Sequence, residues 1–327
     1  MTMHRIRWFS LLLALLFCLS GCGDDTSPAA ASPAVEDIQQ ETTVPMSSYS
    51  ETSSRNSGTS YKVPDFAVAE FHADKAEGNE AVKLDLSAVK EGYVAVSATS
   101  KSRLKFQVIC GDVTYNYDMA SDGTPSIFPL QSGSGAYRFR VMENVSESRY
   151  AELYSAGCDV MLENDFAPFL RTNDYVPYDK NAKCVTKAKE ISSGAADAVG
   201  VVAGVYEFVC ATVTYDREKA STVQAGYLPE PDETMKTGKG ICFDYASLAA
   251  AMLRSQGIPT KMVFGYVSPN DLYHAWNMFY TEETGWVTVG FQVSAGDWNR
   301  LDLTFSAGGA DGAFIGDGNN YTDLYFY

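Results

Sequence analysis

A cysteine in the second half of the chain has the surroundings of a nucleophile. Cys242 follows the run Gly238-Lys239-Gly240 and stands at the first turn of a predicted helix. Glycines allow a close approach of the backbone, and a helix N-terminus presents unpaired N–H groups and positive potential. Both favour the thiolate, which is the reactive form of cysteine. Cysteine is also common in protein cores, so position alone leaves a catalytic and a structural interpretation open.

The small number of histidines identifies one possible general base. The chain contains His4, His72 and His274. His4 falls in the predicted signal peptide, and His72 has no nearby cluster of cysteines or acids with the spacing of metal ligands, so we interpret it as a surface or hydrogen-bonded residue. A Cys–His enzyme in the second half of the chain would therefore use His274, which opens a predicted strand in Tyr273-His274-Ala275-Trp276-Asn277.

A third group should orient the imidazole and stabilise its cationic form. Asp302 and Asp297 are the candidates, and we favour Asp302 because it closes a local apolar run, as a buried acid would. An oxyanion must also be stabilised by donors. The backbone N–H of Cys242 is one natural donor, and the side chain of Gln224 is a hypothetical second, although an ordinary loop glutamine is the alternative.

Helical periodicity places these residues on elements. Valines recur at helical spacing over residues 196–210, and a second apolar stripe predicts a helix over residues 242–255. Gly257-Ile258-Pro259 ends that helix. Strand-like runs follow at residues 261–267, 275–280 and 285–289, and helices followed by an antiparallel sheet define an α+β domain over residues 181–327.

The preceding segment has a different pattern. Residues 63–163 alternate apolar and polar side chains in short runs at intervals of ~8–12 residues, which predicts an all-β sandwich-like domain. Residues 164–180 form a proline- and aromatic-containing connector. The glycine- and asparagine-rich run at residues 316–320 is typical of turns, so we expect neither a metal nor a cofactor.

The N-terminus has the features of an export signal. Arg5 and Arg7 precede the apolar run Phe9–Leu19, which is shorter than the ~20 residues that span a bilayer. The run ends in Leu19-Ser20-Gly21-Cys22, which resembles the lipobox of bacterial lipoproteins. This resemblance implies cleavage before Cys22, lipidation of its thiol and an extracytoplasmic, membrane-anchored protein. An ordinary secretory signal followed by a chance cysteine is the alternative.

Composition limits the other partners. After the signal peptide of residues 1–21, residues 22–62 are rich in Ser, Thr, Pro and Ala and read as a flexible tether. The formal charge of −16 argues against binding to nucleic acid or to an anionic membrane surface, so the lipid anchor is the expected membrane contact. The oligomeric state stays open.

The cysteine count leaves one pairing open. Of seven cysteines, Cys18 lies in the signal peptide and Cys22 is the proposed anchor. The odd remainder leaves at least one thiol unpaired within a monomer. Cys110 and Cys158 both lie in predicted strands, and a disulfide between them is possible.

From about Val213 to the end, the chain resembles bacterial members of the transglutaminase-like superfamily. Three segments match family patterns in order: Thr237-Gly238-Lys239-Gly240-Ile241-Cys242, Arg254-Ser255-Gln256-Gly257-Ile258-Pro259-Thr260 and Tyr273-His274-Ala275-Trp276-Asn277. The resemblance implies a papain-like fold in which Cys242 is the nucleophile, His274 the general base and acid, and Asp302 the orienting acid. Two features depart from the family: Leu303 replaces the usual proline, and Asp302 follows His274 at nearly twice the usual spacing.

The implied reaction is acyl transfer through a thioester. Cys242 would attack an amide carbonyl and His274 would protonate the leaving amine, after which water gives hydrolysis and a second amine gives a crosslink. We expect a cell-surface cysteine protease or peptidase-like hydrolase acting on peptide or isopeptide amides, with a protein or peptide substrate that includes cell-wall peptide. The alternatives are a protein-crosslinking transglutaminase, and a non-catalytic surface adhesin or cell-wall-binding module that retains the fold.

Overall fold

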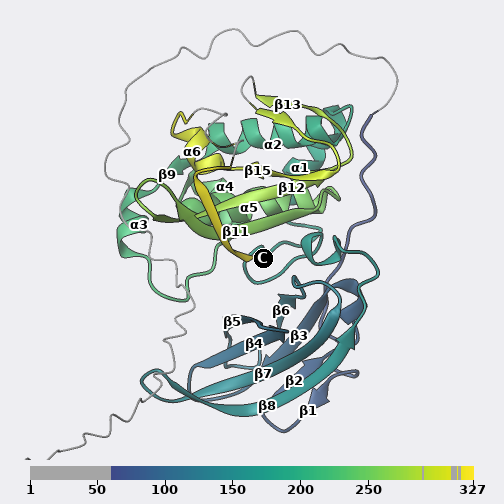
Figure 1. Cartoon of the computed structure of the whole chain (residues 1–327), viewed down its shortest axis with the longest axis vertical. Coiled ribbons are helices and arrows are strands. Elements are labelled where there is room, and N and C mark those ends of the chain that lie inside the picture. Colours follow the sequence, from purple (N-terminus) through teal and green to yellow (C-terminus); the bar gives the residue numbers. More distant parts are fainter. Residues whose placement is uncertain (1–59, 289–290, 311–314, 316–317) are drawn as a thin grey trace, which may run out of the picture.

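The computed structural model describes residues 60–288, 291–310, 315 and 318–327 (Figure 1). The predicted signal peptide of residues 1–21, the lipidation site Cys22 and nearly all of the tether at residues 22–62 lie outside the described residues. Within the described part, no helix is both long enough and apolar enough to cross a membrane.

Two four-stranded antiparallel sheets form the first part of the described chain (Figure 1). One sheet, in the order β1-β2-β3-β6, contains β1 (Glu77–Gly78), β2 (Val82–Asp85), β3 (Tyr93–Ala98) and β6 (Ser126–Pro129). The other, in the order β5-β4-β7-β8, contains β4 (Leu104–Cys110), β5 (Val113–Met119), β7 (Gly135–Ser146) and β8 (Arg149–Val160). The rings of Phe106 and Phe128 stack between the sheets with 4.7 Å between centroids. The predicted all-β, sandwich-like region is confirmed.

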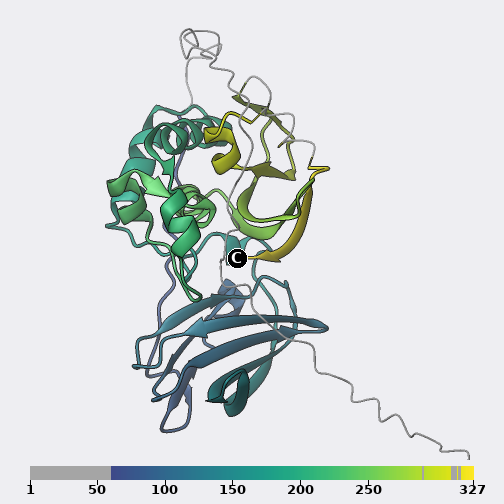
Figure 2. The ribbon, with the colours of Figure 1, turned by 90° about the vertical axis from the view of Figure 1, so that its left-hand side faces the viewer.

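Helices and a third four-stranded sheet form the rest of the described chain. The helices are α1 (Lys183–Gly194), α2 (Ala198–Thr212), α3 (Arg217–Thr222), α4 (Pro231–Thr237), α5 (Cys242–Ser255) and α6 (Leu303–Ala307). The sheet, in the order β15-β12-β11-β16, contains β11 (Thr260–Val267), β12 (Leu272–Thr281), β15 (Asp297–Leu301) and β16 (Tyr321–Phe326). Figure 2 shows most of the helices on one side of these strands and the sandwich below both.

Short elements complete the described fold. In the α+β region they are the parallel pair β9 (Thr214–Tyr215) and β10 (Lys239–Gly240) and the hairpin β13 (Gly285–Thr288) and β14 (Phe291–Val293). Two 3₁₀ turns precede it: η1 (Val89–Glu91) between β2 and β3, and η2 (Ala167–Phe169) in the connector. The predicted helices at residues 196–210 and 242–255 are confirmed as α2 and α5, within two residues at each end. Every residue of α5 is buried, which explains why its sequence is apolar and rich in alanine.

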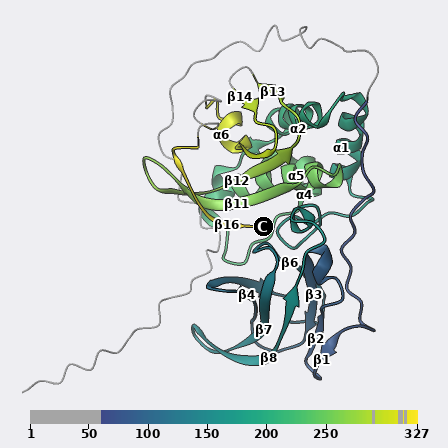
Figure 3. The ribbon, with the colours of Figure 1, turned by 45° about the vertical axis from the view of Figure 1, so that its right-hand side comes forward.

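The two parts of the chain share one core. A single cluster of buried apolar residues runs from Val82 in the sandwich to Tyr327 at the C-terminus. At the boundary, the ring of Tyr117 lies 5.6 Å from that of Tyr327 and 5.7 Å from that of Tyr175, and Tyr175 stacks on Tyr327 at 4.3 Å. Tyr175 also contacts Phe243 of α5 at 5.6 Å. Figure 3 shows the C-terminus at this boundary, so aromatic rings connect the sandwich to the helix that begins with Cys242.

A buried arginine fixes the same boundary. Arg254 of α5 is 2% exposed, and its guanidinium donates to the carbonyl oxygens of Thr260 (2.8 Å), Arg171 (2.8 Å) and Tyr327 (2.6 Å). Burial lowers the pKa of Arg254 from 12.5 to about 10. One side chain thus links the connector, the helix, strand β11 and the C-terminal strand.

The disulfide between Cys110 and Cys158 that the sequence left possible is not formed. Neither cysteine is part of a disulfide, and the same holds for the other cysteines among the described residues. Cys110 on β4 and Cys158 on β8 both lie opposite Tyr137 of the intervening strand β7. Two strand spacings separate their backbones by about 10 Å, whereas a disulfide requires Cα atoms within about 7 Å.

Candidate active site

The backbone before α5 sets Cys242 at the first position of the helix. Gly238 ends α4 in the left-handed conformation with φ of 64°, which favours glycine. Gly240 pairs with Tyr215, and a Cβ atom there would lie 2.7 Å from the Cβ of Asp244. Ile241 is the extended N-cap residue, and the helix begins at Cys242. The glycines therefore serve the close approach that the sequence suggested, and Cys242 lies in the first turn of the helix, where the backbone N–H groups point toward the helix N-terminus.

His274 lies on β12 and meets Asp302 through one ring nitrogen. The Nε2 atom of His274 is 2.9 Å from Oδ2 of Asp302, and both residues are buried. The side chain of His274 also hydrogen-bonds to Cys242. Since Nε2 faces the carboxylate, Nδ1 is the ring nitrogen left for the sulfur. The structure thus brings together the three residues that the sequence selected for a Cys–His–Asp arrangement, whose catalytic roles stay predictions.

Asp302 is held by several donors. It is the N-cap residue of α6, where Oδ1 accepts from the backbone N–H of Phe305 at 3.0 Å. Its Oδ2 accepts from the hydroxyl of Tyr321 at 3.0 Å, in addition to the imidazole. Helix capping therefore fixes the carboxylate without the proline of the family pattern. The alternative acid, Asp297, is exposed, and its Oδ1 accepts from the backbone of the adjacent Trp298.

The charges of this group favour a protonated imidazole. Burial by itself would lower the pKa of His274, but the charge of Asp302, the sulfur of Cys242 and the hydrogen bonds to both raise it from 6.5 to about 10. An imidazolium next to a cysteine stabilises the thiolate. The site therefore favours a protonated His274 at neutral pH, and such an imidazolium would stabilise a thiolate at Cys242.

The group lies in dry, aromatic surroundings. The exposed fractions are 5% for Cys242, 3% for His274 and 0% for Asp302. The ring of Phe305 stacks on the imidazole, with 4.4 Å between centroids and 13° between planes. Electrostatic interactions are stronger where water is excluded, and the stacked ring restricts rotation of the imidazole.

Two tyrosines in the site were not selected from the sequence. Tyr321 binds the acid from strand β16, near the end of the chain. Tyr273 directly precedes His274, and its hydroxyl is buried without a hydrogen-bond partner in the part of the chain that the structure describes. Burial first, and then neighbours that include Cys242, raise the pKa of Tyr273 far above its ordinary value. The sequence could have indicated Tyr273 only through its position directly before His274.

Gln224 lies elsewhere. Its side chain is exposed, and Nε2 donates to the carbonyl oxygen of Thr222 in its own loop at 2.8 Å. The structure does not bring it to the buried group, and an oxyanion role for it stays a prediction. His72, interpreted as a surface or hydrogen-bonded residue, places Nδ1 3.0 Å from Oδ2 of Asp85.

The arrangement can perform nucleophilic catalysis. Cys242 supplies a thiolate at a helix N-terminus, His274 can carry a proton between sulfur and a leaving group, and Asp302 holds the imidazole. No three His, Cys, Asp or Glu side chains gather as metal ligands would in the described ranges.

A family model matches the part of the chain that contains Cys242 and His274. Residues 185–291 match the family model of the transglutaminase-like superfamily, a span that contains Cys242 and His274 and ends before Asp302. The UPF0252 protein MJ1282 of Methanocaldococcus jannaschii is 29% identical over 105 residues, which are 30% of this chain and 28% of that protein. The chain thus spans less than a third of that relative's length.

Solved structures show more distant likeness. A candidate cysteine protease of Cytophaga hutchinsonii superposes with a TM-score of 0.38 and 15% identity, covering 77% of this chain and 73% of that one. LapG of Legionella pneumophila superposes with a TM-score of 0.29 and 15% identity, covering 38% of this chain and 62% of that one.

Proposed function

We propose, from the premise that residues 185–291 form a transglutaminase-like domain, that this protein is a thiol enzyme that transfers acyl groups from peptide or isopeptide amides to water. The observation that carries the proposal is the buried imidazole of His274, which hydrogen-bonds to Asp302 on one side and to Cys242 on the other. A core histidine that serves packing alone needs neither an anionic partner nor a thiol.

The reaction follows from these contacts. The Cys242 thiolate attacks the amide carbonyl carbon, and the tetrahedral intermediate collapses as His274 gives its proton to the leaving amine. The thioester that results is attacked by water, whose proton passes to His274. The sulfur then leaves as thiolate and a carboxylic acid is released. Asp302 holds the ring so that Nδ1 faces the sulfur throughout.

Active-site alkylation tests the nucleophile. A catalytic Cys242 should react with iodoacetamide well below pH ~8.5, the value of a free thiol, because its thiolate is stabilised. Cys158 is the matched control, since burial raises the pKa of its thiol. Reaction of Cys242 only above that pH would favour the non-catalytic binding module.

Two assays distinguish water from an amine as the acceptor of the acyl group. Release of peptides from casein measures hydrolysis, and incorporation of a fluorescent primary amine into casein measures crosslinking. We expect the first activity, abolished by Cys242→Ser. Amine incorporation without peptide release would replace the hydrolase with a crosslinking transglutaminase.

A cell-surface location completes the proposal. Its support is the sequence Leu19-Ser20-Gly21-Cys22, which fits cleavage and lipidation at Cys22. Labelling with radioactive palmitate in a bacterial host should be lost in Cys22→Ala, and unchanged incorporation would remove the anchor. A surface enzyme of this kind would meet proteins and cell-wall peptides as substrates.

A further inference from the structure

A second buried carboxylate lies at the N-terminus of the helix that begins with Cys242. Asp244 is 0% exposed, and Oδ2 accepts from the backbone N–H of Ile241 at 2.8 Å, as a residue at the third position of a helix can. The ammonium of Lys219 donates to the same oxygen at 2.6 Å. The hydroxyl of Tyr227 donates to Oδ1 at 2.5 Å. Three donors from three segments therefore meet on one carboxylate, two residues after the nucleophile.

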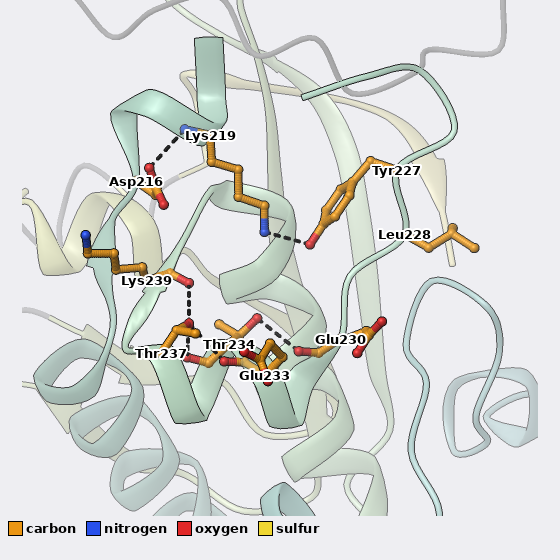
Figure 4. Close-up of a pocket in the computed structure, with 9 residues that line it drawn as sticks. All are labelled: Asp216, Lys219, Tyr227, Leu228, Glu230, Glu233, Thr234, Thr237 and Lys239. Carbon is orange, nitrogen blue, oxygen red and sulfur yellow. Dashed lines mark hydrogen bonds between the residues drawn. The ribbon is translucent and has the colours of Figure 1, made fainter. Parts of the chain in front are cut away.

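Lys219 is held in place for this contact. It lies on α3, whose N-cap residue Asp216 accepts from the backbone N–H of Lys219 at 2.9 Å. Its ammonium also donates to the Tyr227 hydroxyl at 2.7 Å and lies 4.4 Å from the centre of that ring. Both residues line a pocket of about 400 Å³. Figure 4 shows the lysine side chain extending toward the hydroxyl of Tyr227.

Other charges surround this pair. Asp216, Glu230, Glu233 and Lys239 line the same pocket (Figure 4). Glu233 also pairs with the exposed Lys236 at 2.8 Å. The titratable groups that interact with Cys242 include His274 and Tyr273. Asp244 is the carboxylate closest to Cys242 in sequence, and Lys219 is the cation that contacts it.

The position of Asp244 creates an electrostatic conflict. A bare carboxylate in the first turn would cancel the positive potential that the helix offers to the sulfur, and would favour the thiol over the thiolate. A lysine in direct contact neutralises that charge while the carboxylate keeps its hydrogen bond to the backbone before Cys242.

We propose that Lys219 acts as a positioning residue that keeps Cys242 in its thiolate form by neutralising Asp244. The inference rests on the proposed function, in which Cys242 is the nucleophile. It implies that α3, which contributes no group to the reaction itself, sets the reactivity of the site.

A charge cycle on the full chain tests this inference. The pH midpoint of iodoacetamide alkylation at Cys242 is measured by mass spectrometry in Lys219→Met, Asp244→Asn and the double variant. Lys219→Met leaves a bare negative charge, so its midpoint should rise by roughly one pH unit, and Asp244→Asn should lower the midpoint by a similar amount. The double variant should return close to the parent. Lys236→Met is the control and should leave the midpoint unchanged.

The directions of the midpoint shifts distinguish an electrostatic role of Lys219 from a structural one. A merely structural role would disturb the helix in both single variants, so midpoints that rise in both, or shift in neither, would overturn the inference. If Lys219→Met does not fold, the comparison of Asp244→Asn with the double variant remains, and the midpoint must rise on removal of the lysine. A parent Cys242 that reacts only above pH ~8.5 would instead refute the proposed function.

Discussion

Replacing Asp302 with asparagine should weaken the hold of His274 on its proton. Oδ2 of Asp302 lies 2.9 Å from Nε2 of His274, and its negative charge is the largest of the influences that raise the pKa of the imidazole to about 10. An opposite charge at such distances moves a pKa by roughly one to three pH units. We therefore expect Asp302→Asn to lower the pKa of His274 by roughly two pH units, which corresponds to about 3 kcal/mol.

The amide is also a poor geometric substitute. Asp302 accepts on both oxygens, from Phe305 through Oδ1 and from His274 and Tyr321 through Oδ2. An asparagine has one oxygen, so either the helix cap or the pair of side-chain donors must face its NH₂ group. The imidazole then loses its fixed orientation as well as its charge partner.

Proton-detected NMR of the imidazole nitrogens measures this directly. Without residues 1–21 the chain contains two histidines, His72 and His274, and His72 pairs independently with Asp85 at 3.0 Å. His72 therefore serves as an internal reference, because the Asp302 variant leaves its contact with Asp85 intact. A His274 pKa in Asp302→Asn equal to that of the parent would refute the electrostatic reasoning about the site.

Three further outcomes are expected. The folded-state pKa of His274 is raised from 6.5 to about 10. Protonation of His274 therefore stabilises the fold fully below pH 6.5, and this stabilisation is lost as the pH rises through about 10. The free energy of unfolding in urea should decline between about pH 6 and pH 10, and Asp302→Asn should make that decline smaller. Tyr273→Phe removes a hydroxyl without a partner in the described chain, so the free energy of unfolding should stay equal or rise by up to about 1 kcal/mol, and a clear loss would reveal an unseen hydrogen bond. Arg254→Met strips the donor from three carbonyl oxygens and should cost about 3 kcal/mol or more in urea unfolding, whereas a loss below about 1 kcal/mol would contradict its linking role.

The sequence predicted the parts of the fold that repeat an apolar period. Helices α2 and α5 bury large apolar faces, and their spacing was visible. Helices α3 and α6 are six and five residues long, too short to show a period, and their side-chain caps, Asp216 and Asp302, determine where they begin. Helix α1 buries small or polar side chains such as Cys184 and Ser192, which resemble a loop composition.

The sequence predicted the central residues of the site but not the contacts that support them. Residue types and order selected Cys242, His274 and Asp302, since few other residues could serve. The contact of Lys219 with Asp244 was not predicted, because the two lie 25 positions apart and meet only when α3 packs beside the start of α5. Tyr321 binds the acid for the same reason, through strand β16, which returns beside β11.

The aromatic contact between the sandwich and the C-terminal strand has a consequence for any attempt to isolate the enzyme half. Tyr117 is fully buried against Tyr327 and Tyr175, and the buried cluster is continuous across the boundary. A fragment beginning near residue 181 would lack Tyr175 and present the uncovered faces of Tyr325 and Tyr327 to water, an apolar patch that invites aggregation. The described halves should accordingly melt as one calorimetric transition, and inactivity of a truncated fragment would report lost folding cooperativity before it reported anything about chemistry.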